Sequence, residues 1–341
     1  MRRIETIHAA VHVLCHDLTR IVPGEWKGAQ FRKGHVVTQE DIPMLLSMGK
    51  DHLFVWEMDD EHLHENDAAL RLGALCQNAH MQAGDIREGK LELTATVDGL
   101  FQVDTARLEA INTIEDIIIA TRHTNTAVHA GDKLAGMRVI PLVVDKRRIQ
   151  QAEAIGADQP ILTLTPFRPM KAGIITTGNE VFHGRIADRF TPVVQAKLEA
   201  FGIRTVEHVT TDDAVEHIRD AILTMRSKGL EVILCTGGMS VDPDDCTPAA
   251  IRQSGAQIVT YGAPVLPGAM LMLGYFPDGV PIMGLPGCVM YAKATIFDLL
   301  LPRIAAGVPI TRQDVVHLGC GGLCLGCETC TYPNCGFGKE S

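Results

Sequence analysis

The chain has 341 residues, of which 46% are hydrophobic and 21% charged, and its formal net charge is −10. This length predicts two or three domains, because one core stops growing near ~250–300 residues, and the composition excludes a disordered chain. The acidic balance without a long basic tract excludes a general nucleic-acid binder, and no apolar run reaches the ~18 residues of a membrane span. Histidines interrupt any signal-peptide core after the two N-terminal arginines, so we expect a soluble, cytoplasmic protein.

The first half predicts a mixed α+β region with small, irregular sheets. Runs of strand length alternate there with two segments of helical periodicity and frequent Gly or Pro. The expected elements are a helix over 40–48 with Thr38 as N-cap, a strand over 53–56, a helix over 66–82, strands over 91–97 and 100–103 joined as a hairpin by Asp98-Gly99, and a strand over 139–144. A Pro- and Thr-rich linker over 158–169 then separates this region from a more regular half.

The second half predicts an α/β domain with a doubly wound, mostly parallel sheet. From Lys171 onward, short apolar runs alternate with amphipathic helical segments, and this order is typical of such a sheet. The expected strands are 171–175, 203–209, 232–235, 270–273 and 281–284. The expected helices begin at Thr191, Asp213 and Thr247 and after Gly287.

Two of these strands run into loops of small residues, and we regard these loops as the most informative feature of the chain. Thr176-Thr177-Gly178-Asn179-Glu180 follows the first strand, and Thr236-Gly237-Gly238-Met239-Ser240 follows the strand over 232–235. The carboxyl ends of parallel strands form the usual ligand pocket of an open α/β sheet. A third loop, Leu285-Pro286-Gly287, is expected to start a helix whose positive end favours an anion. We therefore predict a site for a phosphorylated ligand.

Carboxylates follow the same strands, in a pattern that suits Mg²⁺ beside a phosphate. The candidates are Glu180, Asp212 or Asp213, Asp242, Asp244 and Asp245. The plainer alternative is that these residues cap helices and form turns.

The ordered motifs T-G-N-E, T-D-D, T-G-G-M-S-V-D-P-D-D and L-P-G, over about residues 170–308, resemble the molybdopterin-binding domain family. That family includes the molybdenum insertases, which are gephyrin-like proteins, and the molybdopterin adenylyltransferases. The stretches VLCHDLT and FRKGHVVTQEDIPMLLSMG resemble, more loosely, the N-terminal region of the insertase branch. The resemblance implies a molybdopterin-binding protein of molybdenum cofactor biosynthesis, with residues 1–165 similar to the insertase N-terminal half.

The resemblance also implies residue roles and a reaction. Acidic catalytic positions would be Glu180, Asp212 and Asp245. Cofactor-binding positions would be Thr177, Gly178, Gly237, Gly238, Ser240, Pro286 and Gly287. The implied chemistry is Mg²⁺-assisted insertion of molybdate into the dithiolene of adenylylated molybdopterin with loss of AMP, that is, a molybdopterin molybdenumtransferase.

The chain departs from the insertase pattern at two loops, has Asp242 where the family usually has glycine after S-V, and lacks a clear M-D-G-Y-A-type motif in its first half. The family's P-G-K-P appears as Pro267-Gly268-Ala269-Met270, and its L-P-G-N-P appears as Leu285-Pro286-Gly287-Cys288-Val289. The first change removes a lysine, for which Arg185, Arg189 and Lys293 are candidate replacements. Whether the protein is an insertase or a carrier of the cofactor, for molybdenum or for tungsten, stays open.

Five of the ten cysteines lie close together near the C-terminus, in the spacing C-x3-C-x2-C-x2-C-x4-C. Clustered cysteines in a cytosolic chain indicate metal binding rather than disulfides. Both an iron–sulfur cluster and Zn²⁺ suit these thiolates, and metal-free thiols are the alternative. The expected ligands are Cys320, Cys324, Cys327, Cys330 and Cys335. We expect residues 318–341 to form a metal-binding tail outside the core of the second domain.

Three functional classes follow from these patterns. The first is cofactor assembly, with a pterin-phosphate ligand. The second is a nucleotide-cofactor hydrolase of the competence-damage-inducible type, a family that shares this domain. The third is a non-catalytic module that delivers cofactor to a molybdoenzyme. A homo-oligomer is compatible with each class, and neither a nucleic acid nor a membrane is an expected partner.

Overall fold

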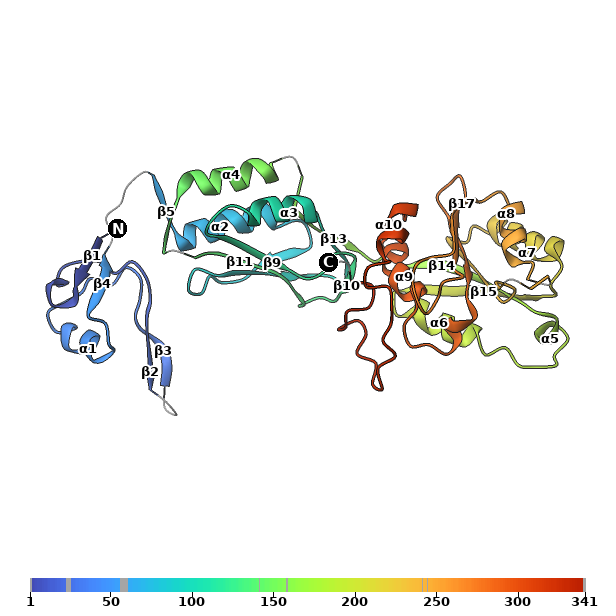
Figure 1. The fold of residues 1–341 in the computed structure, drawn as a ribbon, viewed down its shortest axis with the longest axis horizontal. Coiled ribbons are helices and arrows are strands. Elements are labelled where there is room, and N and C mark those ends of the chain that lie inside the picture. The colour runs from blue at the N-terminus through green and yellow to red at the C-terminus, as the bar shows by residue number, and fades with distance from the viewer. Residues whose placement is uncertain are drawn as a thin grey trace. The chain divides into compact units, whose positions relative to one another are not determined.

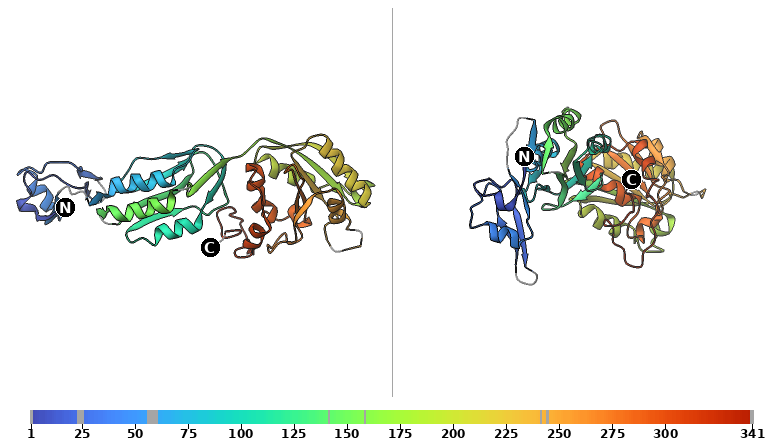
Figure 2. Two further views of the ribbon diagram at one scale, coloured as in Figure 1. Left: turned by 90° about the horizontal axis from the view of Figure 1, so that it is seen from above. Right: turned by 60° about the vertical axis from the view of Figure 1, so that its left-hand side comes forward.

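The computed structural model describes residues 2–22, 26–55, 61–140, 142–157, 159–240, 242–243 and 245–339. The chain forms two compact units, shown in Figures 1 and 2. The first consists of Met1–Thr96, Val103–Arg122 and Ala130–Thr163, and the second of Val97–Gln102, His123–His129 and Leu164–Ser341. The features expected at Trp56, Asp158 and Asp244 lie outside the described residues.

The first fifty-five residues of the first unit form small antiparallel pairs around one helix. Strand β1 (Arg2–Glu5) pairs with β4 (His52–Val55), and β2 (Leu18–Val22) pairs with β3 (Trp26–Phe31). Helix α1 (Ile42–Ser47) packs on the 3₁₀ turn η1 (Thr6–His8). The expected helix over 40–48 is present, but the amide and hydroxyl of Thr38 both donate to the Asp41 carboxylate, so Thr38 is not the N-cap.

The rest of the first unit is a four-stranded antiparallel sheet covered on one face by helices, as Figure 1 shows. Its core contains the fully buried side chains of Leu72, Leu93, Met137 and Ile149. The sheet has the order β6 (Met81–Ala83), β7 (Leu91–Ala95), β11 (Lys133–Val139), β9 (Ile117–Thr121). The helices are α2 (Glu65–Cys76), α3 (Thr105–Asn112) and α4 (Lys146–Gly156), and β5 (His62–His64) pairs with β12 (Val143–Asp145).

Three sequence predictions in this half were wrong in detail. The helix expected over 66–82 ends at Cys76, and residues 81–83 form β6. The Asp98-Gly99 pair is not a hairpin turn, because β7 belongs to the four-stranded sheet whereas β8 (Gly99–Val103) lies between β10 (Thr126–Val128) and β13 (Leu162–Pro166) in another. The single strand expected over 139–144 is the end of β11 and the start of β12.

The second unit contains the predicted mostly parallel sheet. Its six strands have the order β15-β14-β16-β19-β18-β17, and the pairs β14–β15, β14–β16 and β16–β19 are parallel, whereas β18 and β17 are antiparallel additions. The strands are β14 (Met170–Thr177), β15 (Ile203–Thr211), β16 (Val232–Thr236), β17 (Gln257–Tyr261), β18 (Met272–Tyr275) and β19 (Pro281–Leu285). The helices are α5 (Asn179–Phe182), α6 (Thr191–Glu199), α7 (Val215–Ser227), α8 (Thr247–Gln253), α9 (Ile296–Ala306) and α10 (Arg312–His317). Strands β14, β16 and β19 are buried almost throughout, which explains their near-continuous apolar sequences.

The C-terminal residues contribute to the core of the second unit, and this corrects the expectation that the whole of residues 318–341 lies outside that core. Ile310, Val315, Leu318 and Phe337 are all buried in the hydrophobic cluster that also contains residues of α6, β14 and α9. Among the described residues, no helix is long and apolar enough to cross a membrane.

Candidate functional site

The carboxyl ends of the central parallel strands meet at one edge of the second unit's sheet. The register places Thr177 beside Thr211, and Thr236 beside both Thr176 and Leu285. The first two loops, and the third loop at Leu285, therefore begin from adjacent positions. This is the edge where an open α/β sheet binds its ligand.

The second loop approaches the first so closely that two of its residues must be glycine. Gly237 and Gly238 have φ angles of +87° and +57°. A Cβ on Gly237 would lie 2.3 Å from the carbonyl oxygen of Thr177, and one on Gly238 would lie 2.8 Å from Oγ1 of Thr247. Positive φ and the absence of space both require glycine at these two positions.

Threonine hydroxyls fasten the same loop to its surroundings. Oγ1 of Thr247 donates to the carbonyl of Gly237 at 2.9 Å, and the amide of Thr247 donates to the carbonyl of Gly238 at 3.2 Å. Oγ1 of Thr177 lies 3.3 Å from that of Thr247. On the outer side, the hydroxyl of Tyr261 donates to the carbonyls of Met239 and Ser240. The loop is thus held at both ends, while the Ser240 side chain is exposed.

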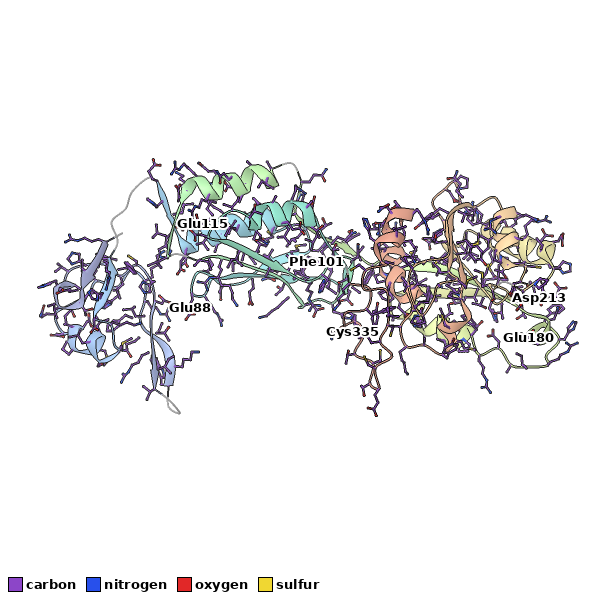
Figure 3. The ribbon with its side chains drawn as sticks, in the orientation of Figure 1. Glu88, Phe101, Glu115, Glu180, Asp213 and Cys335 are labelled. Carbon is purple, nitrogen blue, oxygen red and sulfur yellow. The ribbon has the colours of Figure 1, made fainter. Side chains whose placement is uncertain are left out.

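The first loop places an exposed acid above the edge. Gly178 has φ +133°, and Glu180 follows it in the short helix α5. The amide of Asn179 donates to Oδ2 of Asp213 at 2.9 Å, which joins this loop to the one after β15. Figure 3 shows Glu180 and Asp213 at the same end of the second unit.

The other predicted acids have local partners. Asp212 accepts from Nδ1 of His217 at 2.8 Å and from the Ala214 amide at 3.2 Å, and the hydrogen bond from His217 lowers the pKa of Asp212. The same contact raises the pKa of His217. Oδ2 of Asp245 accepts from the Asp242 amide at 3.0 Å. Of the two alternatives after β15, Asp213 contacts the first loop and Asp212 stabilises the start of α7.

The third loop differs from the prediction. Pro286 and Gly287 lead into a 3₁₀ turn, Gly287–Met290, and the helix α9 begins only at Ile296, where Thr295 and Asp298 form a capping box. A single 3₁₀ turn carries little of the dipole that a full helix would direct at an anion. The prediction that a helix begins directly after Gly287 is therefore wrong. Pro286 and Gly287 still lie at the edge of the sheet, because they directly follow Leu285, the last residue of β19.

Beneath the edge lies a polar network that the sequence analysis missed. Oδ2 of Asp188 accepts from the hydroxyls of Thr191 (2.6 Å) and Thr176 (3.1 Å), and Nε2 of His208 lies 3.0 Å from Oγ1 of Thr176. Since each hydroxyl has one hydrogen, already given to Asp188, Nε2 of His208 must be the donor to Thr176. The one sequence signal was Asp188 three residues before Thr191-Pro192, the pattern of a capped helix start.

Neither expected metal centre has a preformed ligand cage in the part of the chain that the structure describes. Within the residues that the structure describes, no three His, Cys, Asp or Glu side chains come together to hold a metal ion. At the edge acids, a site with fewer than three protein ligands is compatible with Mg²⁺. This ion usually takes one or two carboxylates and completes its shell with substrate phosphate and water. For the cysteines it means that the thiolates would have to move together on binding.

The cysteine segment is tethered to the second unit at several points. The amide of Cys324 donates to the Leu266 carbonyl at 2.8 Å, that of Gly338 donates to the Gly321 carbonyl at 2.9 Å, and the hydroxyl of Tyr332 donates to the Asp298 carbonyl at 3.1 Å. Cys320, Cys327 and Cys330 are exposed, and Cys324 and Cys335 are half-buried against the core. All five thiols therefore lie on a short chain segment whose two ends are fixed.

Family comparison finds matches to two segments of the chain. Residues 173–306 match the family described as a probable molybdopterin binding domain, which confirms the resemblance for this segment. Residues 3–57 match a domain of unknown function, DUF8806.

Individual relatives match only parts of the chain. A CinA-like protein of Desulfosudis oleivorans is 38% identical over 85 residues, which is 25% of this chain and 20% of that protein. A molybdopterin molybdenumtransferase of Synechococcus elongatus is 25% identical over 183 residues, 50% of this chain and 42% of that protein. The chain thus spans well under half the length of these two relatives.

Among solved structures, the molybdopterin biosynthesis enzyme MoaB from Thermus thermophilus has a TM-score of 0.34 at 20% identity, covering 42% of this chain and 98% of that one. The tungsten cofactor synthesizing protein MoaB from Pyrococcus furiosus has a TM-score of 0.32 at 17% identity, covering 41% and 89%.

Proposed function

We propose that the second unit binds molybdopterin by its phosphate at the carboxyl edge, and that the protein acts in molybdenum cofactor biosynthesis. The observation that carries this proposal is the loop Gly237-Gly238, whose close packing on Thr177 and Thr247 excludes any side chain and fixes the backbone of the loop at the carboxyl edge. Fixed amides hold an anion without a cation of their own. The pterin part of the ligand is inferred from the family match of residues 173–306.

Within this proposal, the three loops share the ligand between them. Gly237, Gly238 and Ser240 hold the phosphate, Thr177 and Gly178 line the first side, and Pro286 and Gly287 line the other. Glu180, Asp212 and Asp245 are the proposed acidic positions, acting as one or two direct metal ligands at a time. When bound, Mg²⁺ would neutralise phosphate charge and orient a leaving group. Insertion of metal into adenylylated molybdopterin and carriage of the cofactor both use this arrangement.

The test is ligand extraction combined with one substitution in the second loop. The full chain, purified without oxygen, should release a pterin that fluoresces after oxidation. Gly238→Val should remove it, since the new side chain would clash with Oγ1 of Thr247 and displace the backbone of the loop. Gly255→Val is a matched control, because Gly255 also has a positive φ (+87°) but has open space around it. A folded Gly238→Val protein that still retains the pterin would refute the phosphate cradle.

A nucleotide-cofactor hydrolase is the second candidate, favoured by the 38% identity to a CinA-like protein over 85 residues. Hydrolysis of an ADP-ribose-like substrate, lost on Gly238→Val, together with an absence of bound pterin, would favour this function over cofactor assembly.

We further propose that Cys320, Cys324, Cys327, Cys330 and Cys335 bind an iron–sulfur cluster or Zn²⁺, and that this segment serves contact with a molybdoenzyme in a delivery role. The support is the number of thiols on a short segment with both ends tethered, and the glycines between them that allow closure. In this proposal the chain has three parts, which are residues 1–165, the binding domain over 170–308 and the metal-binding tail over 318–341.

A further inference from the structure

The first unit contains a cavity of about 360 Å³, to which neither the family comparison nor the proposed function assigns a role. Its apolar walls include Phe54, Ile86 and Ile140, and its polar lining includes carboxylates, two cations and two histidines. A volume of this size is within the ~300–1,000 Å³ range of small-molecule sites. The cavity therefore has both the capacity and the mixed lining of a binding site.

One of the carboxylates that line the cavity belongs to Glu65. Glu65 is the first residue of α2, and its side chain is only 11% exposed. Its ion pair with Arg138 measures 3.9 Å, which is too long for a hydrogen bond. Burial is the main influence on this carboxyl, and it raises the pKa of Glu65. Arg138 is too distant to donate a hydrogen bond to this desolvated carboxylate. Hydrogen bonds from the N–H groups of a ligand would therefore stabilise it strongly.

The chain leaves space for this carboxylate. Gly89 has φ +69°, and a Cβ there would lie 2.2 Å from Oε2 of Glu65. The neighbouring His64 is fixed as a neutral ring, with Nδ1 accepting from the Asn66 amide at 3.1 Å and Nε2 donating to the Cys15 carbonyl at 2.5 Å. His64 is thus a support for the start of α2 and not a ligand of whatever enters the cavity.

The remaining lining groups restrict the charge of the ligand. Lys33 and Arg138 are opposed by Asp17, Glu65 and Glu88, so the cavity has no excess positive charge that would attract a phosphate ester. Nδ1 of His16, which also lines the cavity, is buried and lacks a hydrogen-bond partner among the described residues. The cavity therefore offers acceptors, donors and apolar surface to a neutral, flat molecule.

We propose that this cavity binds a neutral bicyclic heterocycle with a 2-amino-4-oxopyrimidine edge, as guanine and pterins have. The Glu65 carboxylate accepts from the ring N–H and the exocyclic amine, since a carboxylate accepts two parallel N–H bonds well. Lys33 or Arg138 donates to the ring carbonyl, and Phe54 covers the ring face. This inference goes beyond the phosphate site of the second unit and does not depend on it.

Calorimetric titration of the full chain tests the proposal with four probes that carry no phosphate: guanosine, inosine, 6-hydroxymethylpterin and its deaminated lumazine counterpart. We expect guanosine or the pterin to bind, and the better of the two identifies the source of the heterocycle. Removing the exocyclic amine, as in inosine and the lumazine, should weaken binding about tenfold or more, because one bond to a charged group is lost. This comparison needs no variant and so does not depend on folding of a mutant.

Two matched variants locate the site. Glu65→Gln should weaken the binding of the favoured probe about ten- to a hundredfold, because one acceptor oxygen becomes a donor facing the ligand amine. Glu115→Gln removes the same charge from an exposed position of the first unit outside the lining and should change affinity by less than about threefold, the usual range for a surface substitution; Figure 3 marks Glu115. The proposal is overturned if neither guanosine nor the pterin binds, if the deaminated probes bind equally well, or if folded Glu65→Gln binds as the unmodified protein does.

Discussion

Asp188→Asn is the substitution whose effect the structure defines most fully. The Asp188 side chain is 17% exposed and accepts four hydrogen bonds. Oδ1 accepts from the amides of Phe190 (2.8 Å) and Thr191 (3.0 Å), and Oδ2 from the hydroxyls of Thr191 and Thr176. Asparagine keeps an oxygen for the two amides and replaces Oδ2 by an amino group that cannot accept.

The expected loss of stability follows from the two bonds to Oδ2. Hydrogen bonds to a charged group contribute ~1.5–3 kcal/mol each, and the hydroxyls can rotate to accept from the new amino group, so we expect a net loss of about 2–3 kcal/mol. For a unit of roughly 150–250 residues, this lowers Tm by about 4–12 °C. Differential scanning calorimetry at pH 7 measures it. Asp220→Asn, at an exposed position on α7, is the control and should stay within ~0.5 kcal/mol of the unmodified protein.

The pH dependence gives this prediction an independent check. Burial opposes ionisation of Asp188, but hydrogen bonds from Thr191, Phe190 and Thr176 outweigh it, so its pKa lies below the ordinary value of 3.8. A depressed folded-state pKa contributes stability above the unfolded value, and the contribution is lost as pH falls through the folded value. The Tm difference between the unmodified protein and the Asp188→Asn variant should thus be full at pH 7 and shrink below about pH 4. An unchanged Tm at pH 7, or a full difference that persists well below the folded-state pKa, would refute the assigned network.

Three further outcomes are expected. Asp245→Ala should weaken Mg²⁺-dependent binding of adenylylated molybdopterin about tenfold or more while Tm falls by only a few degrees, since its carboxylate contacts an exposed amide; unchanged affinity would remove Asp245 from the site. Phe337→Ala should cost about 3–5 kcal/mol of stability because its ring is 5% exposed within the core, and a melting curve equal to that of the unmodified protein would contradict this. Elemental analysis of anaerobically purified protein should find stoichiometric iron or zinc, and the Cys327→Ser/Cys330→Ser double variant should lose it. The control Cys235→Ser, whose thiol is buried in β16, should keep the metal. Absence of metal from the unmodified protein would refute the proposed metal centre.

The identity of the central strands of the second unit was predictable from the sequence, whereas strand pairing in the first half was not. The apolar runs that became β14 and β16 are buried on both faces, so their composition alone indicated central parallel strands. Asp98-Gly99 has the local chemistry of a hairpin, but β8 takes its neighbours from β10 and β13, which lie further along the chain. Leu100 and Phe101 are adjacent and both fully buried, which a strand with one solvent face could not accommodate. Turn propensity is local, and here the packing of both faces overrode it.

The tail was misplaced for a related reason. Its glycines and cysteines predict little packing, and the sequence analysis therefore placed the whole segment outside the core. Two aromatic residues, Tyr332 and Phe337, attach the segment to the core near α9. Their ring centroids are 6.2 Å apart. Burial raises the pKa of Tyr332, consistent with a phenol enclosed by protein. These two side chains hold the C-terminal side of the segment against the core, while Cys327 and Cys330 stay exposed.

The candidate site consists of two halves that differ in how far they are formed before a ligand arrives. The amide half is rigid, because Gly237 and Gly238 are held against Thr177 and Thr247 with no space for a side chain. The carboxylate half is not, because Glu180 is exposed and Asp212, Asp213 and Asp245 satisfy local hydrogen bonds. In the proposed function, a phosphate would bind to the second loop first, and its oxygens would then complete the ligand shell of the metal. In this order of binding, Mg²⁺ affinity depends on the phosphorylated ligand, and titration of Mg²⁺ without that ligand should show no tight site at the edge.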